Sequence, residues 1–400
     1  MEASARQPGL RRSGRTVTAI TFVKRRIPAQ FASSNHPLAV WARRYRSVLI
    51  TFAASRLTIC MLMGFSTMIV VPGESGPRGG FSGILTQGVG AQYVEIATNG
   101  YGTGEAGSGT IGLFPLYPMI VRVVAVVVRD TAISAMLVSN LALLAAGILL
   151  KELLDVHYKD ARISRTAVIF LMFSPVSFFF SGAYAEATLL MLTLGACYAA
   201  ATRRWLIASI VATCASASHG LGWLILLPLL GEYLHAPRHE RVAPRAGILL
   251  LAGPPLGLGA FLLFSWLRFG DALAPLRASE LWNGGLVAPW NAIAATELVP
   301  PFYRAFTLLM LGTAAALWCA GLLLNVRRSY LLYSGVLLVL YACSPGLPSI
   351  ARWLSVVFPL YVVLAVITRR FEWSFEPLLA CSFTLLAFCT VLIANGHWMR

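Results

Sequence analysis

Long apolar runs separated by short polar segments fill the chain from about residue 48 to its end. The runs are continuous and lack a polar stripe, and most approach the roughly 20 residues that a helix needs to cross a hydrocarbon core. The pattern therefore predicts an all-α polytopic membrane protein with about eleven transmembrane helices. The predicted spans cover residues 48–71, 131–150, 166–183, 184–202, 205–217, 218–234, 246–267, 303–325, 329–343, 352–368 and 378–394.

One further apolar run, residues 114–128, is predicted not to cross. It contains Pro115, Pro118 and Arg122. Counting it as a crossing would place the basic loop 151–165 outside, against the rule that cytoplasmic loops are rich in Lys and Arg. We therefore expect an interfacial helix here.

Basic residues concentrate in the N-terminal tail and in the short loops, and the net charge is +16. This distribution places the N-terminus in the cytoplasm. Residues 1–40 are predicted to form a disordered basic cytoplasmic tail, and residues 41–400 a single multi-spanning membrane domain with a first outer loop at 72–113. Nucleic-acid binding is not expected, because no interleaving of aromatic and basic residues on a polar surface accompanies the charge.

The composition indicates a protein embedded in a lipid bilayer. Hydrophobic residues make up 58% of the chain and charged residues 12%, and the mean hydropathy is +0.72, far from the averages of soluble domains. The seven cysteines lie in or beside apolar runs and the histidines are scattered, so no metal site is predicted. No motif for a nucleotide cofactor is present. We expect an integral, multi-pass protein of the cell membrane, in contact with membrane lipids and without a cofactor.

Five segments are predicted to gather on the outer face, namely residues 72–113, 181–186, 216–220, 268–302 and 344–352. Ionisable groups near a membrane-embedded site are costly, so those on this face are functional candidates. The acidic residues there are Glu74, Glu95, Glu105, Glu186, Asp271, Glu280 and Glu297.

Short motifs follow one another between about residues 50 and 395. They are Ser55-Arg56, Tyr93-x-x-Ile96-Ala97-x-x-Gly100-Tyr101, Leu113-Phe114-Pro115-Leu116-Tyr117-Pro118, Ser174-Pro175, Ala183-Tyr184-Ala185-Glu186, Phe269-Gly270-Asp271 with Trp282, Ser349-x-x-Arg352-Trp353 and Phe358-Pro359. The order and spacing of these motifs resemble those of the PIG-V family of membrane mannosyltransferases, the GPI mannosyltransferase 2 group. That family belongs to the GT-C class of polyprenyl-phosphate-sugar enzymes, so the resemblance implies a GT-C-like fold with a site in the outer-face loops.

Two positions depart from the family pattern. Where the family usually carries Trp-Asp, a few residues before the tyrosine that matches Tyr93, this chain has Gly88-Val89. The acidic residue expected to act as catalytic base in the first outer loop is therefore absent. The Thr-Arg usually found before the glycine that matches Gly222 is here Ser218-His219, which removes a fixed positive charge.

The resemblance implies transfer of mannose from a polyprenyl-phosphate-mannose donor to a hydroxyl of a glycolipid acceptor on the outer membrane face, with inversion at the sugar carbon. A carboxylate must take the proton of that hydroxyl. The candidate catalytic residues are Glu95, in the first outer loop, and Glu186, at a helix start. Glu95 stands six positions after Val89, the position of the missing acid. In a helix it would lie about 9 Å along the axis from that position and on a different face. There are alternatives for both residues. Glu95 is then a solvated loop glutamate, and Glu186 either positions substrate or is an ordinary acid favoured at a helix N-terminus.

Cationic or amide donors must hold the phosphate leaving group. Arg352 is the first candidate, because a guanidinium binds two phosphate oxygens in one plane, and Arg268 and Arg122 are alternatives. Arginines at helix ends also extend to the membrane interface without binding a ligand. The remaining candidate substrate-binding residues are Asp271, Tyr101, Tyr117, Trp282 and His219.

Each of these residues also has an ordinary structural explanation. The aromatic residues belong either to a sugar pocket or to the aromatic belt of the membrane interface. His219 replaces a positive charge only when protonated, and otherwise is a packing histidine.

Two functions of different class are compatible with these residues. One is an active glycosyltransferase whose base has migrated. The other is a catalytically inactive family member that binds lipid or serves as the partner subunit of a membrane glycosylation machinery. A transporter is less favoured, because the charged residues cluster on one face rather than along a midplane path.

Overall fold

The structure is a computed structural model that describes residues 37–69, 80–102, 110–237 and 251–396. The chain divides into two units, Met1–Arg44 and Tyr45–Arg400. Residues 1–36 of the predicted cytoplasmic tail lie outside the described residues, and the short helix α1 (Pro37–Arg44) is the described part of the first unit.

Every regular element among the described residues is helical, which confirms the all-α prediction. The helices of the second unit are α2 (Arg46–Ile69), α3 (Gly80–Leu85), α4 (Val89–Asn99), α6 (Leu116–Val128), α7 (Thr131–Tyr158), α8 (Ala161–Met172), α9 (Glu186–Ala201), α10 (Trp205–Ser218), α11 (Leu226–His235), α13 (Gly253–Phe269), α14 (Ala274–Asn283), α15 (Pro289–Ala295), α16 (Pro301–Leu323), α17 (Arg328–Ala342), α18 (Ile350–Leu354), α19 (Phe358–Arg370) and α20 (Phe375–Ala394). Short 3-10 turns join them, at η2 (Thr110–Gly112), η3 (Ser177–Ser181), η4 (Gly222–Ile225), η6 (Thr296–Leu298), η7 (Leu347–Ser349) and η8 (Glu372–Ser374).

Within the described ranges, four helical segments are long and apolar enough to cross a membrane, and the protein is an integral membrane protein. They are α2, α7, α16 and the stretch Glu372–Ala394, and the bent pair formed by α13 and Ala274–Glu280 is a fifth if counted as one span. Shorter apolar helices, α9, α10 and α17, occupy three of the other predicted spans, whereas the predicted span 166–183 is interrupted between the end of α8 and η3. The count of about eleven crossings therefore stays a prediction. Helix α6 has 13 residues, or about 20 Å, which is less than the roughly 30 Å hydrocarbon core.

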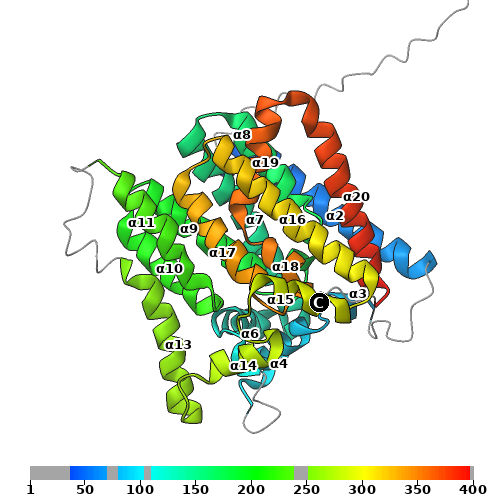
Figure 1. Cartoon of the computed structure of the whole chain (residues 1–400), viewed down its shortest axis with the longest axis vertical. Coiled ribbons are helices and arrows are strands. Elements are labelled where there is room, and N and C mark those ends of the chain that lie inside the picture. The colour runs from blue at the N-terminus through cyan, green and yellow to red at the C-terminus, as the bar shows by residue number, and fades with distance from the viewer. Residues whose placement is uncertain (1–36, 70–79, 103–109, 238–250, 397–400) are drawn as a thin grey trace, which may run out of the picture. The chain divides into compact units, whose positions relative to one another are not determined.

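Segments that the sequence places on one face meet at one end of the second unit. In Figure 1, α4, α6 and α14 lie together at the lower end. η2 packs against α14 so closely that a Cβ on Gly112 would lie 3.3 Å from the side chain of Ala278. The described parts of the segments 72–113 and 268–302 therefore contribute to the same end of the bundle.

Two segments that carry basic residues, at the start of α8 and at the end of α19, contact each other. Arg369 donates a 2.7 Å hydrogen bond from Nε to Asp160, and Arg162 pairs with Glu372. The hydrogen bond from Arg369, with those from backbone N–H groups, holds the pKa of the Asp160 carboxyl below its usual range. Because Asp160 also caps α8, this contact fixes the start of α8 against the end of α19.

Arg56 of α2 fixes the turn between α8 and α9. Its Nη1 donates to the carbonyl of Ser177 at 3.0 Å and to Oγ of Ser181 at 2.7 Å, and its Nη2 donates to the carbonyl of Met172 at 3.3 Å. Buried backbone and hydroxyl oxygens gain partners in this way. The guanidinium of Arg56 therefore helps to hold the turn that precedes Glu186, together with bonds from Asn140 to Ser181 and from Ser139 to the carbonyl of Tyr184.

Candidate functional site

A buried ion pair joins the start of α9 to α18. Oε1 of Glu186 lies 3.1 Å from Nε of Arg352, and the two side chains are 10% and 12% exposed. Burying one of these charges without the other would be strongly unfavourable. The sequence singled out both residues, and the structure brings them into contact.

Tyrosine side chains surround this ion pair. Cζ of Arg352 lies 5.9 Å from the ring centroid of Tyr184. Tyr93 on α4 lies close enough to interact with the charges of both Glu186 and Arg352. The rings of Tyr93 and Tyr117 meet edge to face, with centroids 5.1 Å apart. Aromatic rings therefore border the ion pair, while the hydroxyl of Tyr117 is hydrogen-bonded to the carbonyl of Ala135 and to Ser139 rather than to Glu186.

His219 lies in the turn between α10 and η4, within range of the charge of Arg352. The backbone N–H of Leu221 donates to its Nδ1 at 3.1 Å, so the neutral ring carries its proton on Nε2. Burial, together with the positive charge of Arg352, lowers the pKa of His219 to about 4. A neutral N–H donor thus stands where the family resemblance leads us to expect an arginine. We call Tyr93, Tyr117, Tyr184, Glu186, His219 and Arg352 the Glu186 cluster.

Some buried polar atoms near this cluster have no hydrogen-bond partner among the described residues. They include Oε2 of Glu186 and Nε2 of Gln87. The hydroxyl of Tyr184 donates to the carbonyl of Gln87 at 3.0 Å, so Gln87 borders the cluster. Such atoms are rare in native proteins, and a ligand or water usually completes their bonding.

The position of the missing acid also borders the cluster. Val89 is the first residue of α4 and follows Gly88, whose φ is 55°. A Cβ on Gly90 would lie 3.4 Å from the carbonyl oxygen of Ala183 and 3.6 Å from the ring of Tyr184. The start of α4 therefore packs on the turn that leads to Glu186.

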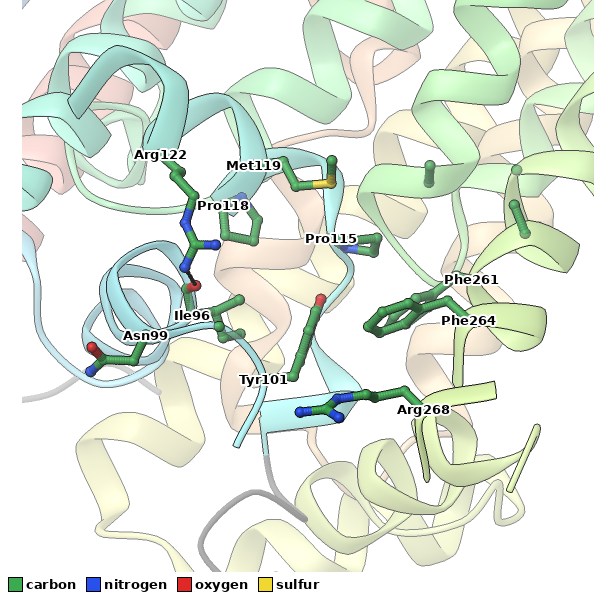
Figure 2. A pocket seen from close by; sticks show the side chains of 14 residues that line it. Ile96, Asn99, Tyr101, Pro115, Pro118, Met119, Arg122, Phe261, Phe264 and Arg268 are labelled. Carbon is green, nitrogen blue, oxygen red and sulfur yellow. Dashed lines mark hydrogen bonds between the residues drawn. The ribbon is translucent and has the colours of Figure 1, made fainter. Parts of the chain in front are cut away.

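A cavity of about 530 Å³ lies between α6, α10 and α13 (Figure 2). The residues that line it are Ile96, Asn99, Gly100, Tyr101, Pro115, Pro118, Met119, Arg122, Ala217, Gly257, Ala260, Phe261, Phe264 and Arg268. Most of these side chains are apolar, two are arginines, and none is acidic. A cavity of this size suits a small molecule or part of a lipid.

The two arginines of the cavity differ in their bonding. Arg122 donates from Nε to the carbonyl of Ala97 at 2.7 Å and from Nη2 to that of Thr98 at 3.1 Å, which satisfies the C-terminal carbonyls of α4. Arg268 forms no hydrogen bond or ion pair with the described residues. Figure 2 shows its guanidinium directed toward Tyr101.

The segment Phe114–Pro118 separates the cavity from the Glu186 cluster. Pro115 and Pro118 line the cavity, whereas the side chain of Tyr117 is fully buried and its hydroxyl is hydrogen-bonded inside the bundle. The ring of Phe114 packs on Phe261 of the cavity wall, with centroids 4.7 Å apart. One short segment therefore contributes to both places.

Tyr101 and Asp271 have partners of their own. The hydroxyl of Tyr101 donates to the carbonyl of Leu113 at 2.6 Å, and its ring forms part of the cavity wall. Asp271 accepts from the backbone N–H of Leu273 at 2.9 Å and pairs with Arg277 at 2.9 Å. Its carboxylate therefore holds the turn before α14.

Glu95 lies apart from the cluster. Its side chain is exposed on α4 and accepts a 2.6 Å hydrogen bond from Asn99, whereas Tyr93 on the same helix is buried. The side chain of Trp282 lies outside the described residues. The catalytic and binding roles of all these candidates stay predictions.

Residues 109–223 match the model of a protein family described as Mannosyltransferase (PIG-V). This region of the chain is PIG-V-like. The match confirms the resemblance drawn from the motifs and supports a glycosyltransferase. The PIG-V-like region contains the segment Phe114–Pro118, Glu186 and His219. No curated protein matches the chain.

Solved structures similar to this chain include an oligosaccharyltransferase from Archaeoglobus fulgidus. Its form with a tethered acceptor peptide is 11% identical with a TM-score of 0.45, and the match covers 89% of this chain and 55% of that one. A complex of the same enzyme with an inhibitory peptide and dolichol-phosphate is 11% identical with a TM-score of 0.42, covering 89% and 56%. The chain thus spans about half the length of these proteins.

Several residues of the two sites were not chosen from the sequence. Tyr93 and Tyr184 were noted within motifs but not as site residues, although Tyr184 stands two positions before Glu186. Phe261 and Phe264 gave no sequence signal, because they lie in an apolar run where every position looks alike. Within the part of the chain that the structure describes, no three His, Cys, Asp or Glu side chains are grouped to hold a metal.

Proposed function

We propose that this protein transfers mannose from a polyprenyl-phosphate-mannose donor to a lipid-linked acceptor. The observation that carries the proposal is the buried Glu186–Arg352 pair, with an unpartnered carboxylate oxygen, beside the PIG-V-like segment Phe114–Pro118. A buried carboxylate beside a guanidinium, bordered by aromatic rings, suits a sugar phosphate.

Arg352 holds the phosphate of the donor. Its guanidinium offers several N–H groups in one plane. Nε lies 3.1 Å from Oε1 of Glu186 but forms no hydrogen bond within the described part of the chain. The ring of Tyr184 fixes the guanidinium from one face. The phosphate leaves as an anion and requires little protonation, so positive charge beside it stabilises the transition state.

Glu186 takes the proton of the acceptor hydroxyl through Oε2. The hydroxyl oxygen forms a bond to the anomeric carbon from the side opposite the phosphate, and the carbon–oxygen bond to the phosphate breaks. Both electrons of that bond stay with the phosphate. Glu186 suits this role better than Glu95, because Glu95 is exposed and bonded to Asn99. When the donor phosphate engages Arg352, less positive charge acts on Glu186, so its basicity rises.

His219 supplies a neutral donor to the same substrate. Its Nε2 carries the proton, and its position within range of Arg352 suits an N–H bond to a sugar or phosphate oxygen. In this proposal the enzyme is a multi-pass protein of the cell membrane with a cytoplasmic N-terminus and an outer-face site. Val89, which stands where the resemblance leads us to expect an acid, is what favours the inactive alternative, and no contact among the described residues points to a protein partner.

The test is transfer of labelled mannose from polyprenyl-phosphate-mannose to lipid by the purified full chain in liposomes. Glu186→Gln keeps the shape and an oxygen for Arg352 but removes the base, and Arg352→Ala removes the phosphate contact. We expect each to lower transfer by about 100-fold or more. Glu95→Gln and Arg304→Ala are the controls and are expected to keep activity near that of the wild type.

Two results would contradict the proposal. One is the absence of transfer by the wild type across several lipid acceptors, with a folded protein. The other is a Glu186→Gln variant that changes only the KM for the donor, because that outcome assigns Glu186 to positioning Arg352 rather than to proton transfer.

A further inference from the structure

The cavity between α6, α10 and α13 takes no part in the chemistry proposed for the Glu186 cluster. We infer that it binds the phosphate-bearing headgroup and first chain segment of an anionic membrane lipid. This inference rests on the proposed function, in which that lipid is the acceptor.

The positive charge of the cavity lining favours an anionic ligand. Arg122 and Arg268 line the cavity, and none of its lining residues among those that the structure describes is acidic. The carbonyls at the end of α4 engage Arg122 on one side, whereas Arg268 has no partner among the described residues. A guanidinium without a counter-ion at an apolar cavity suits an anion, and a phosphate diester matches its planar donors.

The apolar walls of the cavity favour a lipid. Pro118, Met119 and Phe264 give it an apolar surface. On the same helix as Phe264, the side chains of Leu263 and Leu267 are 53% and 72% exposed, as expected where α13 faces lipid. A cavity of about 530 Å³ holds a headgroup and a few carbons, so the rest of the chain must extend along α13 into the bilayer.

The position of the cavity favours the acceptor over the donor. In the proposed reaction the phosphate of the donor occupies Arg352, which is buried in the Glu186 cluster rather than in the cavity wall. The two places are close, because a Cβ on Gly220, next to His219, would lie 3.4 Å from the Phe114 ring, which packs on the cavity wall. A transferase that joins two lipid substrates needs two such neighbouring places.

The experiment measures lipid binding to the full chain in detergent by native mass spectrometry. The probes are phosphatidylglycerol, phosphatidylcholine and a short polyprenyl phosphate. Arg268→Ala removes the unpaired cation, and Ala260→Trp fills the cavity from an exposed position of its lining. Arg304→Ala removes one positive charge elsewhere, and Gly259→Trp places the same ring where nothing lies within 4 Å.

We expect phosphatidylglycerol to bind about tenfold more weakly to Arg268→Ala and Ala260→Trp than to the wild type, with both controls unchanged. Polyprenyl phosphate should keep its affinity in these variants and lose it in Arg352→Ala. Equal phosphatidylglycerol binding in all variants would overturn the inference, as would loss of polyprenyl phosphate alone from Arg268→Ala, which would assign the cavity to the donor. If Arg352→Ala leaves polyprenyl phosphate binding intact, the proposed function fails and the cavity result stands separately.

Discussion

The hydroxyl of Tyr184 donates a 3.0 Å hydrogen bond to the carbonyl oxygen of Gln87. This bond ties the residue two positions before Glu186 to the residue two positions before Val89. The start of α4 and the start of α9 therefore meet at the cluster, although the segments are far apart in sequence. Position 89, where the family resemblance leads us to expect an acid, belongs to the surroundings of the site.

Replacing Val89 with Asp should raise transfer. A carboxylate at the first residue of α4 is favoured by the helix dipole, and Val89 packs against the buried cluster that contains Tyr184. We expect Val89→Asp to increase kcat by about tenfold or more, because a second base shortens the path of the proton. The measurement is the initial rate of mannose transfer at saturating donor. Val89→Asn is the matched control, and equal rates for the two variants would show that position 89 takes no part in proton transfer.

Arg56 should be required for folding of the turn before Glu186. Its guanidinium reaches the carbonyls of Met172 and Ser177 and the hydroxyl of Ser181, whereas a lysine ammonium cannot reach all of these oxygens. We expect Arg56→Lys to lower the free energy of unfolding by about 2 kcal/mol, the scale of a lost charged hydrogen bond. Thermal unfolding in detergent checks this. Arg162→Ala, at an exposed pair, serves as control, and an equal shift in both would contradict the special role of Arg56.

Helix positions could be predicted from the sequence, because apolar runs of membrane length leave the backbone few alternatives to a helix. The pairing of Glu186 with Arg352 could not be predicted, since it depends on how α9 and α18 pack. Sequence proximity drew attention to Glu95 as the carboxylate nearest the missing acid. In the structure Glu95 is exposed while Tyr93 is buried, as expected for helical residues two positions apart.

The cavity could not be predicted from the sequence for a related reason. Arg122, inside the apolar run 114–128, and Arg268, just after the predicted span 246–267, were noted only as alternatives to Arg352. What makes them a pair is the angle of α13 against α6 and α10, which no periodicity within one helix encodes. In the sequence, an aromatic residue of the cavity wall such as Phe264 cannot be distinguished from a residue that faces lipid.

Glu232 should stabilise the bundle at a second buried ionic cluster. Its side chain is 1% exposed, lies 2.7 Å from Nε of Arg327 and accepts a 3.2 Å hydrogen bond from Tyr330. Removing one partner of a buried pair leaves an uncompensated charge, so Glu232→Gln should lower the free energy of unfolding by about 3 kcal/mol. The exposed pair of Glu297 with Arg304 gives the control, for which Glu297→Gln should cost less than about 1 kcal/mol. Equal shifts in the melting temperature of the two variants would contradict this difference.

His219 should make the folded protein less stable in mild acid. Burial and the charge of Arg352 lower its pKa in the folded state to about 4, whereas an exposed histidine titrates near 6.5. Below about pH 6.5 the unfolded chain therefore binds a proton that the folded protein does not. The contribution of neutral His219 to stability is complete above that pH and is lost as the pH falls toward 4.

Unfolding at a series of pH values measures this effect. We expect the wild type to lose about 2 kcal/mol between pH 7 and pH 4.5 through this group, and His219→Asn to lose correspondingly less. His235→Asn is the control, since His235 is exposed and bonded to the carbonyl of Gly231 on its own helix. A wild type and a His219→Asn variant with the same pH dependence would show that His219 is not held neutral. That result would place the pKa of His219 near its ordinary value of about 6.5, so that a protonated ring would stand beside Arg352 in mild acid.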